Sequence, residues 1–368
     1  MIKIAMLSFG DIDNYGDIFF ALIFENEVKK RIRNVQIDNF APFGGIFSGV
    51  IYKKYEIEEL NKYDAVVLAG GEIVHKRNER TWDPIYSKRK MSLSEKNYSD
   101  IVWKMHYSTP KFKAFFSVGV LPLECENDRK ELNNIINELS YFSVRGLLSK
   151  KIIENELNYN ENIHITPDLG WYFAEYVNNT NIKVTLELPE NYFIFQINSV
   201  EEREENLIAQ QLDQFIFENN NLNCVLLPII KPWEDVKYLK GIYNKIQNKD
   251  RVFLLDYLNV IETGKVILHS KFVIGSSLHS AITAMSGAIP AGVINKWPGS
   301  KFQDLFFTQF KDDYLTTNIN RVYNLCNKLK NYTELNYKAD VKYSEFMKIK
   351  LQNSFDYLCS KIINNESK

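Results

Sequence analysis

Short apolar segments of strand length alternate with longer helical segments through most of this chain, and that alternation constrains the fold more than any other feature. The first apolar segment, residues 2–9 (IKIAMLSF), is followed by a helical pattern over about 17–33. Further buried-strand candidates lie at 64–69 (DAVVLA) and 114–118 (AFFSV), with helical stretches after them. Continuous apolar strands separated by helices are typical of a parallel sheet covered on both faces. We therefore predict an α/β fold.

A second alternating series begins near residue 190, with strand-like segments that include 192–197 (YFIFQI) and 272–274 (FVI). Between the two series, the polar segment 175–190 is the best linker candidate. Two parallel-sheet domains would place the carboxyl ends of their strands around a central cleft, where open α/β sheets bind ligands. The predicted organisation is an N-terminal domain over 1–178, a C-terminal domain over 188–315, and a helical tail over 316–368 that packs on the domains.

Composition excludes several classes of protein. The 45 basic and 46 acidic side chains give a net charge of -1, which argues against a protein-wide nucleic-acid footprint. None of the four cysteines lies in a C-x-x-C pair or near a histidine at metal-ligand spacing, so we expect no disulfide framework and no metal site. The N-terminal apolar run is too short for a signal peptide, and no transmembrane helix is expected. The expected location is cytoplasmic.

The first segment that could carry chemistry is Asn14-Tyr15-Gly16-Asp17, where the first helix should begin. Free backbone N–H groups at a helix start attract anions or polar sugar groups, and Gly16 allows a close approach. Asp17 could equally cap the helix, so a capped turn without a ligand is the other interpretation. The segment is not a G-x-G-x-x-G fingerprint, and nicotinamide binding is not supported.

Two glycines, Gly70 and Gly71, follow the apolar run at 64–69 and precede Glu72. Glycines there make room for a ligand or form a tight turn. Arg145 comes at the end of another apparent strand, and an Arg so placed can hold a carboxylate or phosphate by two parallel bonds. A salt bridge to a nearby acid is the alternative. Asp168 ends the next strand and could cap a turn or act as a catalytic carboxylate.

The most suggestive segment is 273–282 (VIGSSLHSAI), in which a buried strand ends in a glycine and serines before a helix begins near Leu278. The serine hydroxyls and the helix N-terminus form a plausible phosphate cradle. His279 would lie in the first turn, and an imidazole there can transfer protons near neutral pH. A purely structural histidine is the alternative. The candidate binding residues of this cradle are Ser276, Ser277, Leu278 and Ser280.

Taken in order, these segments resemble the polysaccharide pyruvyl transferase family. The resemblance spans about 14–305, and Lys301 fits the family's usual lysine after the last strand. The matching motifs are NYGD at 14–17, VVLAGGE at 66–72, FFSVGVLPL at 115–123, SVRGLLSKKII at 143–153, TPD at 166–168 and IGSSLHSAITAMSGAIPAGVI at 274–294.

The resemblance implies two Rossmann-like domains arranged as in GT-B glycosyltransferases, with the acceptor on the N-terminal side and the donor on the C-terminal side. It implies phosphoenolpyruvate as co-substrate, a sugar in a bacterial surface glycan or its precursor as acceptor, and a pyruvate ketal as product. Carried over by motif, His279 is the general acid and Arg145 the donor anion contact. A carboxylate such as Asp17 or Asp168 is the candidate base for the hydroxyl proton. The implied donor-side residues are Ser276, Ser277, Leu278, Ser280 and Lys301. The implied acceptor-side residues are Asn14, Gly16, Asp17, Gly70, Gly71 and Glu72.

This chain departs from the family at three positions. The family commonly has an Asp where this chain has Gly146, a third glycine where it has Glu72, and an Arg where it has Ser277. Losing the Arg weakens the case for a strongly anionic donor. A GT-B-type glycosyltransferase using a nucleotide sugar and a non-catalytic sugar-binding scaffold are therefore the alternatives. The scheme requires no cofactor or metal, and a lipid-linked acceptor would allow peripheral contact with the inner face of the cell membrane.

Overall fold

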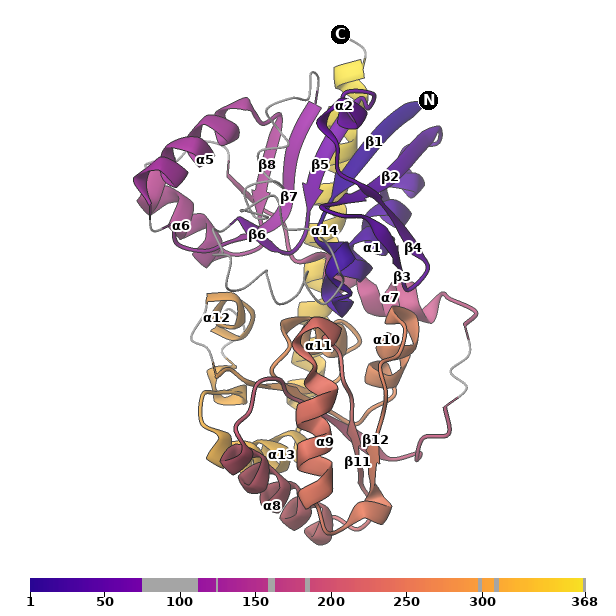
Figure 1. The fold of residues 1–368 in the computed structure, drawn as a ribbon, viewed down its shortest axis with the longest axis vertical. Coiled ribbons are helices and arrows are strands. Elements are labelled where there is room, and N and C mark those ends of the chain that lie inside the picture. Colours follow the sequence, from indigo (N-terminus) through magenta and orange to yellow (C-terminus); the bar gives the residue numbers. More distant parts are fainter. Residues whose placement is uncertain are drawn as a thin grey trace. The chain divides into compact units, whose positions relative to one another are not determined.

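The structure, a computed structural model, describes residues 1–74, 112–123, 125–157, 163–182, 186–296, 300–307 and 311–366 (Figure 1). The chain forms two compact units. Unit 1 comprises Met1–Leu169 together with Lys348–Lys368, and unit 2 comprises Gly170–Met347. The predicted linker at 175–190 lies in unit 2, and its residues 183–185 are outside the described part of the chain.

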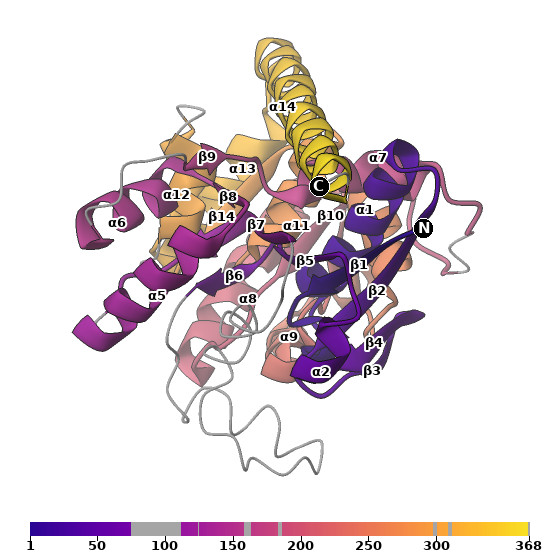
Figure 2. The ribbon, with the colours of Figure 1, turned by 90° about the horizontal axis from the view of Figure 1, so that it is seen from above.

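Unit 1 is built on a sheet whose strands follow the order β3-β4-β2-β1-β5-β7-β8-β9, with β6 paired to β7. Figure 2 shows the strands of the main path side by side in this order. All described pairs are parallel except β3 with β4. The strands are β1 Ile2–Leu7, β2 Val35–Ala41, β3 Gly45–Phe47, β4 Val50–Lys54, β5 Ala65–Ala69, β6 Glu72–Val74, β7 Phe112–Val120, β8 Tyr141–Val144 and β9 His164–Ile165. The helices are α1 Tyr15–Arg31, α2 Ile57–Leu60, α5 Glu126–Glu138 and α6 Leu147–Leu157.

The sequence explains why β1 and β5 lie in the middle of this sheet. Every residue of β5 is buried, and Lys3 is the one exposed residue of β1. A strand covered on both faces needs such a continuous apolar run. Helix α1 begins at an Asn14 N-cap and ends with three basic residues in its last turn, which suits the negative end of the helix dipole.

Unit 2 contains a fully parallel sheet in the order β12-β11-β10-β13-β14-β15. Counted from its first strand, this is the order 3-2-1-4-5-6 of the Rossmann fold. The strands are β10 Tyr192–Gln196, β11 Asn223–Leu226, β12 Val252–Leu254, β13 Val273–Gly275, β14 Ala291–Ile294 and β15 Leu315–Thr316. The helices are α7 Phe173–Asn178, α8 Glu202–Glu218, α9 Asp235–Lys245, α10 Val260–Leu268, α11 Leu278–Ser286, α12 Ser300–Phe307 and α13 Val322–Lys330. The predicted α/β class is confirmed in both units.

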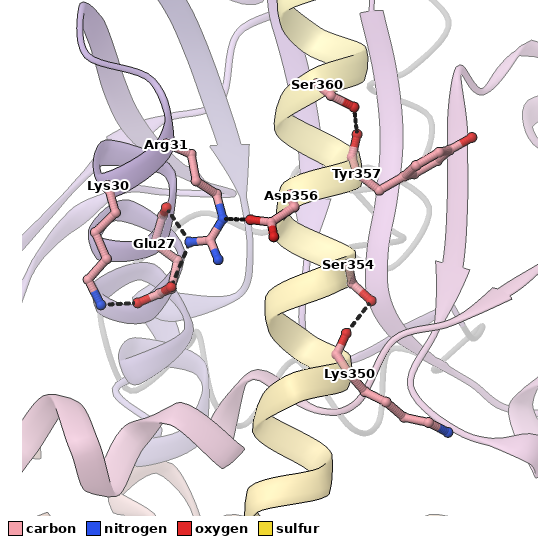
Figure 3. Close-up of polar contacts among 8 residues, drawn as sticks. All are labelled: Glu27, Lys30, Arg31, Lys350, Ser354, Asp356, Tyr357 and Ser360. Atoms are coloured by element: carbon pink, nitrogen blue, oxygen red, sulfur yellow. Dashed lines mark hydrogen bonds and ion pairs between the residues drawn. The ribbon is translucent and has the colours of Figure 1, made fainter.

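The C-terminal tail ends in one continuous helix, α14 (Glu334–Glu366), which contributes residues to both units (Figure 1). Within unit 1, the fully buried Phe355 packs against Phe24 of α1 and Phe116 of β7, with ring centroids 6.1 and 4.7 Å away. Next to it, Arg31 Nε donates to Asp356 Oδ1 at 2.6 Å (Figure 3). The second half of α14 is therefore part of the core of unit 1.

The unit boundary differs from the sequence prediction, which placed it at residue 178 and kept 316–368 as a separate tail. Residues 170–178 belong to unit 2 because α7 packs closely on α10. A Cβ atom on Gly264 would lie only 2.8 Å from Phe173 and 2.9 Å from Val177. The tail is divided between the units at Met347 because its two halves bury side chains in different cores.

None of the described helices combines the length and apolar character needed to cross a bilayer.

Two serines of α14 provide a matched test of how the tail is anchored. Ser344 is buried in unit 2 and its Oγ donates to the carbonyl oxygen of Ser286 at 2.9 Å, whereas exposed Ser360 donates to Tyr357 of its own helix (Figure 3). We expect Ser344→Ala to lower the free energy of unfolding by about 1 kcal/mol, because Ser286 loses a partner inside the protein. Urea unfolding measures this. Equal effects for Ser344→Ala and Ser360→Ala would contradict the anchoring role.

Candidate functional site

In unit 1, the candidate site lies at the carboxyl ends of β1 and β5, where the strand order changes direction. The turn after β5 depends on glycine, since Gly70 and Gly71 have φ of 70° and 74°, which side chains rarely adopt. A Cβ atom on Gly70 would lie 2.6 Å from the Phe20 ring, and one on Gly71 would lie 3.3 Å from Asp17 Oδ1. The structure therefore brings the first turns of α1 against the β5 turn.

The start of α1 serves partly as a cap and partly as a source of negative charge. Asn14 is the N-cap, and its Oδ1 accepts a hydrogen bond from Gly16 N at 3.1 Å. The turn is therefore capped, but by Asn14 and not by Asp17, which was the predicted cap. Asp17 lies in the first turn, and its negative charge disfavours ionisation of the Tyr52 hydroxyl. Burial, and then the charges of Asp17 and Asp11, raise the pKa of Tyr52 far above its ordinary value. Tyr52 is therefore a protonated hydroxyl at neutral pH.

Three charged side chains come together beyond the β5 turn: Arg145 after β8, Glu72 at the start of β6, and Asp168 after β9. Arg145 Nη2 lies 3.0 Å from Glu72 Oε1, and Nη1 lies 3.8 Å from Asp168 Oδ2. The side chains of Arg145, Glu72 and Asp168 are 7%, 14% and 6% exposed, so the group is largely shielded from solvent. The guanidinium already faces two carboxylates, which differs from the expectation of an arginine available to a donor anion.

Ser117, in the middle of β7, holds the segments that carry this charged group. Its φ of 58° is unusual for a residue other than glycine and accompanies a register shift between β7 and β8. Its N–H donates to Ser143 Oγ at 2.9 Å, and its Oγ donates to the carbonyl oxygen of Pro167 at 2.8 Å. A backbone conformation of this kind costs about 1–3 kcal/mol and persists where the surroundings enforce it. The local sequence contains no signal for it.

In unit 2, the candidate site lies at the carboxyl ends of β10 and β13, which pair Gln196 with Gly275. Ser277 is the N-cap of α11, and its side chain accepts from Ser280 N at 3.4 Å. Ser280 is buried, and its Oγ donates to the carbonyl oxygen of Ser277 at 2.9 Å. His279 follows in the first turn and is half-buried. The predicted helix start and the place of His279 on it are confirmed.

A buried polar network beneath this loop was not anticipated from the sequence. Gln196 is fully buried at the end of β10, and its Oε1 accepts from Ser276 N at 3.0 Å. Its Nε2 donates to Asp235 Oδ2 at 3.2 Å, and the same oxygen accepts from Ile229 N and Ile230 N at 2.7 and 3.0 Å. Burial raises the pKa of the Asp235 carboxyl. The polar Gln196 inside an otherwise apolar strand was the one available signal.

The predicted residues are divided between the two units. Lys301 lies in α12 of unit 2, with its ammonium 5.5 Å from the centroid of the Phe302 ring. No group of three His, Cys, Asp or Glu side chains arranged as metal ligands occurs in the described ranges. Unit 1 contains Asn14, Gly16, Asp17, Gly70, Gly71, Glu72, Arg145 and Asp168. Unit 2 contains Ser276, Ser277, Leu278, His279, Ser280 and Lys301.

Comparison with known proteins gives one family and a set of similar folds. The family model described as polysaccharide pyruvyl transferase matches residues 14–296, which include both strand-end sites. No curated protein matches the chain.

Three solved structures illustrate the shared fold. S. aureus MnaA with UDP has a TM-score of 0.63 at 14% identity, covering 99% of this chain and 95% of that one. UDP-GlcNAc 2-epimerase from Neisseria meningitidis, bound to UDP-GlcNAc, has a TM-score of 0.61 at 10% identity, covering 99% and 100%. Anabaena HepE in complex with UDP-glucose has a TM-score of 0.55 at 10% identity, covering 99% and 100%. The chain therefore has a GT-B-like fold.

Proposed function

The chain belongs to the polysaccharide pyruvyl transferase family and is a transferase, and from this premise we propose that it moves pyruvate from phosphoenolpyruvate onto a sugar. The acceptor would be a sugar of a bacterial surface polysaccharide or its precursor, and the product a ketal across two hydroxyls. One observation carries the proposal: His279 lies in the first turn of α11, directly after β13, at the switch point of a Rossmann-ordered sheet. Anionic ligands bind at such helix starts.

The proposed donor chemistry assigns one proton transfer to His279. Protonation of the methylene carbon of phosphoenolpyruvate makes the neighbouring carbon electrophilic, and a sugar hydroxyl attacks there. A second hydroxyl then displaces inorganic phosphate and closes the ketal ring. The α11 dipole disfavours a protonated imidazole, but the bound phosphate supplies the opposite charge. The donor would lie against Ser277, Leu278 and Ser280, with Lys301 as a further cation of unit 2.

The proposed acceptor site is the strand-end edge of unit 1. Carboxylates accept hydrogen bonds and so suit the hydroxyls of a sugar. Asp168 is the candidate base for a hydroxyl proton, and Arg145, whose Nη1 lies 3.8 Å from Asp168 Oδ2, would hold that carboxylate in place. We place the acceptor against the Asn14–Asp17 and Gly70–Glu72 segments. A lipid-linked precursor would bring the enzyme to the inner face of the membrane.

A second candidate is glycosyl transfer from a nucleotide sugar. Two observations favour it: the similar structures named above contain UDP or UDP-sugars, and Ser277 supplies no positive charge beside His279. A pyrophosphate could use the same helix start.

A thermal-shift panel with phosphoenolpyruvate, UDP, CMP, GDP and their sugars tests the proposal. We expect phosphoenolpyruvate at 100 times its dissociation constant to stabilise the protein by about 2.7 kcal/mol, seen as a raised Tm, because it binds only the folded state. A positive result is followed by measuring phosphate release with sugars whose hydroxyls can close five- or six-membered rings. Stabilisation by a nucleotide alone would exclude phosphoenolpyruvate and support glycosyl transfer.

A further inference from the structure

Asn198, two residues beyond β10, belongs to none of the motifs above, yet it lies beside Ser276 in the candidate donor site. Its backbone N–H donates to Ser276 Oγ at 3.2 Å, and Ser276 Oγ donates to Asn198 Oδ1 at 2.9 Å. The side chain of Asn198 is half-buried. The Ser276 hydroxyl therefore makes hydrogen bonds to Asn198, although the sequence analysis assigned it to binding of the donor substrate.

The buried network determines which way the Asn198 amide points. A carboxylate only accepts, so Asp235 forces the NH2 group of Gln196 to its side and leaves Gln196 Oε1 facing Ser276. That oxygen already accepts from Ser276 N and lies 3.4 Å from Ser276 Oγ. The hydroxyl proton thus goes to the closer Asn198 Oδ1. Asn198 Nδ2 points away from Ser276 and makes no hydrogen bond within the described part of the chain.

The loop that carries Asn198 is also held by a residue that follows a third strand, β14. Ser199 has a φ of 54°, and its carbonyl oxygen accepts from Lys296 Nζ at 2.8 Å. Lys296 follows β14 and also pairs with Glu204 Oε2 at 2.5 Å. The segments after β10, β13 and β14, which are neighbours in the sheet, are therefore tied together. The NH2 group of Asn198 is a hydrogen-bond donor on a loop held by these contacts, and such a group is preorganised to bind a ligand.

We propose that Asn198 is a donor-binding residue whose Nδ2 donates a hydrogen bond to an anionic oxygen of the donor substrate. The inference rests on the proposed function, because it assumes that the donor binds at the α11 start. A neutral amide takes part of the role of the family's arginine at the position of Ser277. Gln196, Ser276 and Asp235 are positioning residues that act through the direction of this amide.

The test compares Asn198→Asp and Asn198→Ala with wild type by calorimetric titration of phosphoenolpyruvate, with UDP and inorganic phosphate as further probes. Asn198→Asp replaces the NH2 group, a hydrogen-bond donor, by a negatively charged carboxylate that repels an anion. We expect the affinity for phosphoenolpyruvate to fall by about 30-fold or more. Asn198→Ala removes one hydrogen bond, and a loss of about 10-fold is expected. Asn220→Asp, an exposed change of the same charge near the opposite ends of the strands, should bind as wild type does.

The outcomes separate this inference from the proposed function. Unchanged affinity in a folded Asn198→Asp protein, when wild type binds phosphoenolpyruvate, overturns the role of Asn198 alone. If wild type binds only UDP and Asn198→Asp loses it, the role of Asn198 is supported and phosphoenolpyruvate is excluded. Binding of none of the three probes by wild type overturns both. Circular dichroism and the Tm of each variant show whether it is folded. If Asn198→Asp does not fold, the affinity of Asn198→Ala decides whether Asn198 binds the donor substrate.

Discussion

Replacing His279 by Ala is expected to lower kcat by about 10²–10⁴-fold, the usual contribution of a general acid, while the protein stays folded. In the proposed mechanism, the imidazole on the first turn of α11 is the proton donor. The measurement is the rate of phosphate release with phosphoenolpyruvate and an accepted sugar. In wild type, the same rate should fall at high pH, as the imidazole loses its proton, and this dependence should disappear in the variant.

His269→Ala provides the control, because His269 is an exposed histidine at the C-terminus of α10 in the same unit. Within the described part of the chain, its Nδ1 makes a hydrogen bond with the carbonyl oxygen of Lys265 at 2.7 Å. We expect its kcat to match wild type. Normal turnover in His279→Ala would remove this residue from the mechanism and leave the protonation step to another group.

Replacing Arg145 by Met is expected to destabilise unit 1 by about 3–5 kcal/mol, because it removes the guanidinium that faces the largely buried carboxylates of Glu72 and Asp168. Methionine preserves most of the side-chain length, so the loss reports charge more than packing. Urea unfolding, monitored by fluorescence and circular dichroism, measures the change.

A double-mutant cycle shows whether the ion pair causes the loss. Adding Glu72→Gln to Arg145→Met removes the carboxylate charge that lies nearer to the lost guanidinium, so the double variant should be more stable than Arg145→Met alone. Lys130→Met is the matched control, since Lys130 pairs with Glu126 at 2.8 Å while both side chains are about 70% exposed, and it should cost less than about 1 kcal/mol. Additive effects of the two substitutions would show that Arg145 and Glu72 are not coupled.

The elements predicted well from the sequence are those with a strong local pattern. Strand β10 and helix α11 were predicted to within a residue, since an uninterrupted apolar run and a serine before a helical stretch are local signals. Strands β2 and β4 were not predicted, because they mix polar with apolar residues and are partly exposed. The helical tail was predicted, but its division between two cores depends on distant partners.

The same distinction applies to the candidate sites. The turns after β1, β5 and β13 were found from glycines, serines and caps next to apolar runs. The Glu72–Arg145 pair joins residues 73 positions apart, and the Gln196–Ser276 contact joins residues 80 apart. Neither pair could be predicted from spacing, because only the folded sheet brings the ends of those strands together.

The division of α14 has a consequence for the order in which the protein matures on the ribosome. Unit 2 is one uninterrupted stretch, whereas unit 1 needs both Met1–Leu169 and Lys348–Lys368. Domains generally fold as they are synthesised, from the N-terminus onwards. Here the stretch that emerges first must wait for the stretch that emerges last, and until then Phe24 and Phe116 lack the Phe355 ring that covers them. The nascent chain therefore carries an incomplete apolar surface through nearly the whole of its synthesis, the period in which chaperones bind such surfaces.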